Sequence, residues 1–127
     1  MPKGRPQSVK DLVTQAGVVA NTVAVLATML HRQLDTDTGD LSEARRQSSV
    51  VAGEASRLAT LVSRLPPLAE LAEDTVAAAK LATRAEASLH GPSADRSLAQ
   101  LAAAELGQTA WSINARIAGA AKRVGPT

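Results

Sequence analysis

The stretch that decides the fold is residues 9–34, VKDLVTQAGVVANTVAVLATMLHRQL. Its apolar residues return every three or four positions, which is typical of one face of an α-helix. The residues expected on the buried stripe of this helix are Val9, Leu12, Val13, Ala16, Val19, Ala20, Val23, Leu26, Ala27, Leu30 and Leu34. Ser8 is the expected N-cap, with Asp11 three residues later in the first turn.

Three further segments repeat this helical pattern. The second begins at Asp40 or Ser42 after the polar loop 35–40 and ends before Pro66-Pro67, because proline lacks an amide donor and restricts the residue before it. The third runs from Leu68 to the stop signal His90-Gly91-Pro92. The fourth begins near Ser93 or Asp95 and continues to Val124.

The same periodicity predicts which residues of these segments are buried. On the second segment the stripe is Leu41, Ala44, Ser48, Val51, Ala55, Leu58, Val62 and Leu65. On the third it is Leu68, Leu71, Ala72, Ala79, Ala82 and Leu89, with Thr75 and Glu86 on or near it. On the fourth it is Leu98, Ala99, Ala102, Leu106, Ala110, Ile113, Ile117, Ala120 and Val124.

Four segments of this length joined by short connections predict an all-α, antiparallel, up-and-down four-helix bundle. The alternative is a three-helix arrangement in which one long helix is kinked at Pro66-Pro67. In either case we expect a flexible basic arm at residues 1–8, a single helical-bundle domain at residues 9–124 and a tail at residues 125–127.

The composition predicts a thin core and no enzymatic chemistry. The chain of 127 residues contains 26 Ala, 15 Leu and 11 Val but no Cys, Phe or Tyr, and its net charge is +2. Each alanine buries little apolar area, so a core built this way is marginal alone or gains burial by assembling with another chain. Because no catalytic or metal-binding constellation is recognisable, we expect no enzyme, no cofactor, no metal and no small-molecule substrate.

The uncharged run Leu12–Leu30 raises the question of a membrane span or a signal peptide. Polar residues such as Asn21 and Thr28 interrupt the run, and no small-residue cleavage pattern follows it. We therefore expect a buried core helix, no membrane partner and a cytoplasmic protein, or an assembled component encoded by a phage or plasmid.

Two helices have more apolar surface than one bundle face requires. A helix that is apolar on both sides is either central to a structure or covered by a partner. The expected interface residues, which lie away from the core stripes of the first and fourth segments, are Val18, Val25, Met29, Leu101, Trp111, Ala115 and Ala118. Tryptophan is enriched at binding hot spots. The sequence therefore favours a non-enzymatic interaction protein that acts through protein–protein contacts and associates with itself.

The alternative function is that of a DNA-binding accessory protein. Residues 3–6, Lys-Gly-Arg-Pro, resemble the core of an AT-hook, a family of short arms that lie in the minor groove of AT-rich DNA. That resemblance implies roles for Lys3 and Arg5 and covers these four residues only. On the second segment Arg46, Arg57 and Arg64 share one outer line, with Arg45 beside it, and such a row can contact phosphates.

A third class, a phosphotransfer domain with a phosphorylated helical histidine, fits the sequence poorly. Those domains place Lys and Gly shortly after the histidine, whereas Arg32, Gln33, Leu34 and Asp35 follow His31.

Overall fold

The computed structural model describes residues 8–36, 41–92 and 94–124. The elements in chain order are α1 (Val9–Thr36), α2 (Ser42–Ser63), the 3-10 helix η1 (Pro66–Leu71), α3 (Ala72–Ser88) and α4 (Arg96–Val124). The described residues contain no strand.

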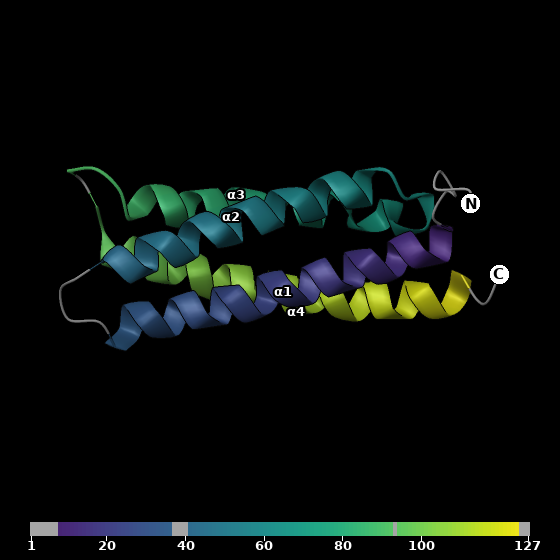
Figure 1. The fold of residues 1–127 in the computed structure, drawn as a ribbon, viewed down its shortest axis with the longest axis horizontal. Helices are drawn as coiled ribbons and strands as arrows, with labels where there is room; N and C mark the ends of the chain where they lie inside the picture. Colours follow the sequence, from purple (N-terminus) through teal and green to yellow (C-terminus); the bar gives the residue numbers. More distant parts are fainter. Residues whose placement is uncertain (1–7, 37–40, 93, 125–127) are drawn as a thin grey trace, which may run out of the picture.

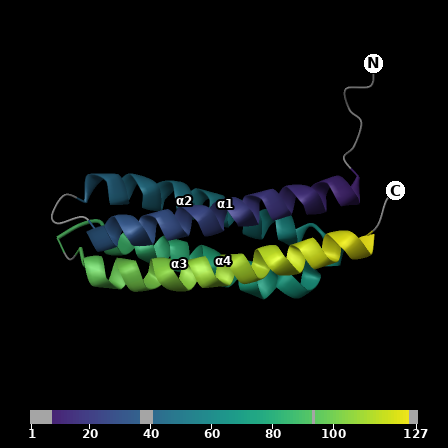
Figure 2. The ribbon, with the colours of Figure 1, turned by 90° about the horizontal axis from the view of Figure 1, so that it is seen from below.

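The four α-helices form an elongated antiparallel bundle (Figure 1). Each packs against two neighbours, in the ring α1–α2–α3–α4 and back to α1, and the view from below shows the same arrangement (Figure 2). The α1/α4 side of the bundle is therefore opposite the α2/α3 side. The prediction of an up-and-down four-helix bundle is confirmed.

The alternative of three helices with a kink at Pro66-Pro67 is wrong. Helix α2 ends at Ser63, and Leu65 takes an extended conformation with φ −119° and ψ 101°. Proline at the start of η1 requires no amide hydrogen bond there, so the chain can turn through η1 and enter α3 in the opposite direction. The two prolines break the helix because the residue before a proline disfavours the helical region.

The core follows the expected stripe most closely on α2, where every predicted residue except the half-buried Leu41 is buried. Two predicted core residues are exposed instead: Val9 in the first turn of α1 and Leu98 in the first turn of α4. On α3 the buried face includes Ala78, Leu81 and Ala85, which the sequence pattern missed. Alanine occurs on both sides of α3, so periodicity alone does not define its inner face.

Helices α1 and α4 approach closely because small residues line their contact. Gly107 is buried against Ala27 and Thr28, and Gly17 lies against Ile117. These two contacts define an antiparallel register in which Val25 and Trp111 lie at nearly the same level, close to the midpoints of α1 and α4.

Side-chain caps and polar links hold the helix ends. Ser8 Oγ accepts a hydrogen bond of 3.1 Å from the amide of Asp11, which confirms the predicted N-cap of α1. Asp95 Oδ1 accepts from the amides of Ser97 and Leu98 and caps α4. Between α2 and α3, Ser49 Oγ donates a 2.6 Å hydrogen bond to the Glu86 carboxylate, so Glu86 is held by a serine.

Candidate functional site

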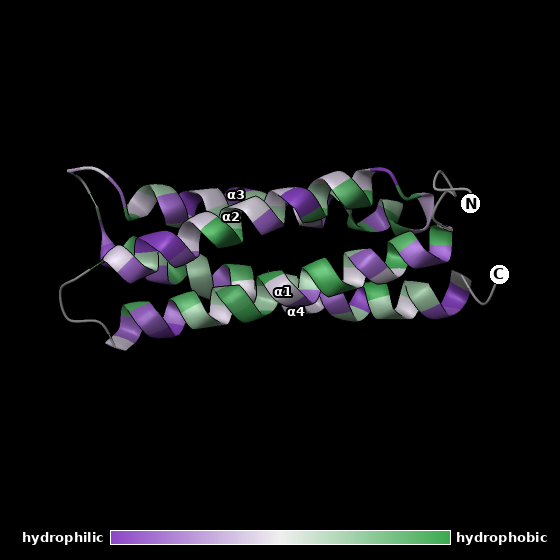
Figure 3. Cartoon of the chain, in the orientation of Figure 1, coloured by the Kyte–Doolittle hydropathy of each residue, from purple (hydrophilic) through white to green (hydrophobic). Residues whose placement is uncertain are grey.

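The expected interface residues all lie on the exterior of the bundle. Val18 is 62% exposed, Trp111 is 46% exposed, and Val25, Met29 and Leu101 are also among the large exposed apolar side chains. Ala115 and Ala118 are exposed as well. Apolar colouring is prominent on the visible side of α1 (Figure 3). Large apolar side chains at this exposure, gathered on two adjacent helices, mark a candidate interaction surface.

The structure brings some of these residues together along the junction of α1 and α4. Val18 and Ala118 line one hollow of about 390 Å³ between the two helices. Trp111 lines a second hollow of about 220 Å³ with Thr28 and Ala104. Val25, at the level of Trp111, lies between the two hollows. We call the surface formed by Thr14, Val18, Asn21, Val25, Thr28, Ala104, Trp111, Ala115 and Ala118 the α1/α4 face.

Two predicted interface residues lie at the margin of the α1/α4 face or beyond it. At 3.6 residues per turn, Leu101 is about 80° around α4 from Trp111, so it points toward the α3 side of the bundle. Met29 is about 40° around α1 from Val25, toward the α2 side. The sequence pattern placed Leu101 and Met29 opposite the core stripes of their helices. Only the arrangement of the four helices shows that these two residues do not share the face of Trp111.

The middle of the α1/α4 face carries no formal charge. Helix α1 has no Asp, Glu, Lys or Arg between Asp11 and Arg32, and α4 has only Glu105 between Arg96 and Arg116. Glu105 is about 120° around α4 from Trp111 and therefore lies off the face. Polar groups within the face are the neutral side chains of Thr14, Asn21 and Thr28, and the Thr28 hydroxyl donates to the Ala24 carbonyl within its own helix.

The residues of the alternative DNA-binding hypothesis have different surroundings. Lys3 and Arg5 lie outside the described residues. Arg45 Nε donates a 2.7 Å hydrogen bond to the carbonyl of Leu89 at the end of α3, so this arginine has a structural contact. Arg46 and Arg57 pair along α2 with Glu43 at 2.6 Å and Glu54 at 3.7 Å. The hydrogen bond that Arg46 donates to the Glu43 carboxylate, together with the negative charge of that carboxylate, raises the pKa of Arg46.

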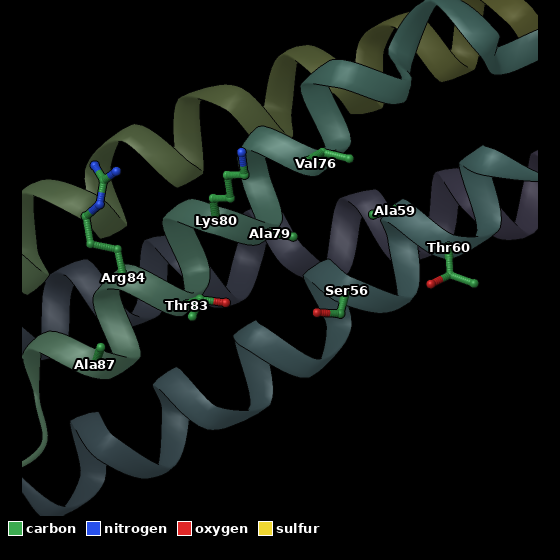
Figure 4. Close-up of a pocket in the computed structure, with 9 residues that line it drawn as sticks. All are labelled: Ser56, Ala59, Thr60, Val76, Ala79, Lys80, Thr83, Arg84 and Ala87. Atoms are coloured by element: carbon green, nitrogen blue, oxygen red, sulfur yellow. The ribbon is translucent and has the colours of Figure 1, made fainter.

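A groove between α2 and α3 was not expected from the sequence. Its volume is about 560 Å³, and Figure 4 shows Lys80 and Arg84 extending from α3 and Ser56 and Thr60 from α2. The remaining lining residues are Ala59, Val76, Ala79, Thr83 and Ala87. Lys80 and Arg84 are four residues apart, so they lie on one side of a helix, and this spacing was the available signal. The predicted topology places α2 beside α3, but the sequence did not indicate which residues of α2 lie next to Lys80 and Arg84.

Two further observations bear on the class of site. Among the described residues, no group of three His, Asp or Glu side chains is placed to hold a metal ion. In the same part of the chain, α1 is the one helix long and apolar enough to cross a membrane, and 39% of its most apolar 18-residue window is buried. The core helix of a soluble protein and a signal sequence meet the same criterion, so this finding assigns no membrane role.

Comparison of the chain with protein-family models, with curated proteins and with solved structures finds no match.

Proposed function

We propose that this chain is a non-enzymatic interaction protein that associates with a second copy of itself through the α1/α4 face. The observation that carries the proposal is the surface around Trp111, which extends over two helices and contains two hollows lined by no Asp, Glu, Lys or Arg, with His31 in the hollow beside Trp111. An exposed tryptophan flanked by hollows has the form of an interface anchor.

The absence of charge favours a second copy as the partner. In a two-fold symmetric contact the same patch lies on both subunits, so any net charge on the patch faces a like charge. The middle of the α1/α4 face avoids this repulsion because its polar groups are neutral. Val25 and Trp111 lie near the midpoints of their helices, so two such faces can overlap along most of their length.

The size of the face sets the expected strength of association. Residues 12–30 of α1 span about 28 Å and two adjacent helices about 20 Å, which gives roughly 560 Å² per copy and roughly 1,100 Å² in a pair. Stable interfaces bury about 1,200–2,000 Å² in total, so this one lies just below that range. We therefore expect a reversible dimer whose population depends on concentration.

The test is the solution mass across about 5 to 500 μM, in the range where interfaces of this size dissociate. We expect the mass to rise from 13.1 kDa toward twice that value. Val18→Lys places a charge in the face and should keep the chain monomeric. The matched control is Val50→Lys, because Val50 is 50% exposed but lies on α2, outside the face.

The sole tryptophan gives an independent readout of the same contact. Trp111 emission should shift to shorter wavelength as concentration rises in the wild-type chain and in Val50→Lys, but not in Val18→Lys, because only association removes its indole from water. A monomer at every concentration, or equal effects of the two lysine substitutions, would contradict the proposal.

A further inference from the structure

The groove between α2 and α3 is lined by cations and hydroxyl groups without a carboxylate. Among its nine lining residues, Lys80 and Arg84 are basic, Ser56, Thr60 and Thr83 carry hydroxyls, and the other four are alanine or valine. Figure 4 shows the two basic side chains extending from α3 on the side away from α2, so they border the groove at its outer edge. The small side chains of the floor allow a ligand to approach the helix backbones closely.

The α2 rim of the same groove adds more positive charge. Thr60, which lines the groove, lies about one turn from both Arg57 and Arg64. These exposed arginines do not line the groove but lie next to Thr60 on the outer line that continues to Arg46, so cations lie along the outer edges of both helices. Cations on both rims match a ligand that carries negative charge along its length.

The acidic residues that pair with the α2 arginines do not prevent these arginines from binding a negatively charged ligand. Glu54 pairs with Arg57 at 3.7 Å, and Glu43 pairs with Arg46 near the start of α2. Both pairs are between neighbours on one exposed helix, and exposed pairs of this kind contribute little. A phosphate can therefore replace the carboxylate as the partner of either guanidinium.

We propose that the α2/α3 groove binds the phosphate backbone of duplex DNA, with Lys80 and Arg84 on one rim and Arg57 and Arg64 on the other. Hydroxyl groups such as those of Ser56 and Thr60 are typical donors to phosphate oxygens. The groove has no aromatic side chain on which unpaired bases could stack, which favours a duplex over a single strand. Basic groups on both rims favour a phosphate backbone over an acidic helical peptide, because such a peptide carries its negative charge along one edge and would contact only one rim.

This site is separate from the α1/α4 face because it lies on the opposite side of the bundle. It also differs from the basic arm, since its residues belong to α2 and α3 or, in the case of Arg64, directly follow α2. Failure of DNA binding would leave self-association untouched, and a monomeric chain could still bind DNA through the groove.

The experiment measures binding of a fluorescently labelled 24-base-pair duplex by anisotropy, from about 50 to 200 mM salt, where phosphate contacts dominate the affinity. The parent chain carries Lys3→Ala and Arg5→Ala, so that the arm does not contribute. In this parent, the pair Lys80→Ala and Arg84→Ala should weaken binding about tenfold at the lower salt concentration. It should also reduce the slope of log affinity against log salt by about 2.

The matched control is the pair Lys122→Ala and Arg123→Ala, which removes the same charge from the exposed last turn of α4. We expect this pair to leave affinity and slope nearly unchanged, and circular dichroism to show the same helicity in all variants. Equal losses of affinity in the two double variants would mean that net charge alone attracts the duplex. That result would overturn the proposal that the groove binds DNA. The proposal is also overturned if the parent binds no duplex at about 50 mM salt, or binds single strands or acidic helical peptides in preference.

Discussion

Gly53 and Gly91 show how one residue type has opposite consequences at two positions. A Cβ at Gly53, in the exposed middle of α2, would meet nothing within 4 Å. Gly91 has φ +80°, a conformation that residues with a Cβ rarely adopt. Its neighbours in the turn after α3 depend on that geometry, since Asp95 donates its amide to the Ser88 carbonyl at 2.7 Å.

We therefore expect Gly53→Ala to stabilise the protein by about 0.5–1 kcal/mol, because alanine restricts the unfolded chain and favours the helix. Gly91→Ala should destabilise it by about 1–2 kcal/mol, because the positive φ becomes strained. Urea unfolding at one fixed protein concentration measures both changes. A stabilising Gly91→Ala would show that the turn does not require this conformation.

At the scale of elements, the contact between α1 and α4 depends on small side chains. Gly107 shows how much side-chain volume this contact accepts. An added Cβ would lie 3.8 Å from Thr28 Oγ1 and 3.9 Å from Ala27 Cβ, which is ordinary van der Waals contact. There is room for a methyl group, whereas a longer side chain must extend past Thr28 and Ala27 or into the hollow beside Trp111 that Gly107 also lines. The glycine ahead of Trp111 thus serves the packing of the chain's own helices.

Gly107→Ala should raise the free energy of unfolding by about 0.5–1 kcal/mol through helix propensity. Gly107→Leu should lower it by about 1–3 kcal/mol, because the larger side chain forces the two helices apart. Thermal and urea unfolding followed by circular dichroism distinguish the two outcomes. If leucine were tolerated as well as alanine, the close approach of α1 to α4 would be refuted.

At the scale of the whole molecule, the thin core and the partly unburied α1 connect stability with assembly. Of the residues in the most apolar 18-residue window of α1, 39% are buried in the single copy, so the others keep at least part of their surface in contact with water. A chain that gains burial on association becomes more stable as its concentration rises. The α1/α4 face and the α2/α3 groove are on opposite sides, so one contact does not block the other.

We expect the melting temperature to increase by several degrees between about 5 and 200 μM, because mass action favours the dimer. In Val18→Lys the melting temperature should not depend on concentration, whereas Val50→Lys should behave like the wild-type chain. Differential scanning calorimetry or circular dichroism at several concentrations provides the measurement. A concentration-independent wild-type transition would indicate that unfolding begins from a single copy.

Much of the fold was predictable because its signals are local. The stripe of α2 alternates clearly with polar residues, so its buried set was identified almost completely. The stripe of α3 was not, because alanines such as Ala77 and Ala79 make its outer side resemble its inner side. Leu98 fits the spacing of the α4 stripe, yet it follows Asp95 by one turn at the helix start, where neighbouring helices no longer cover it.

The sequence by itself determined the helical segments, the cap at Ser8 and the interruption at Pro66-Pro67, because hydrogen-bonding caps, missing amide donors and helical periodicity act within a few residues. The structure decided that the two prolines end α2 rather than kink a longer helix, and that Asp95 caps α4. Only the tertiary structure decided which side chains of neighbouring helices face each other. That arrangement brings Val18 beside Ala118, directs Arg45 to the Leu89 carbonyl, turns Leu101 away from Trp111 and sets Lys80 and Arg84 along a groove with α2. These relations join residues far apart in the chain, and they depend on how alanine-rich surfaces pack, which periodicity in one helix does not specify.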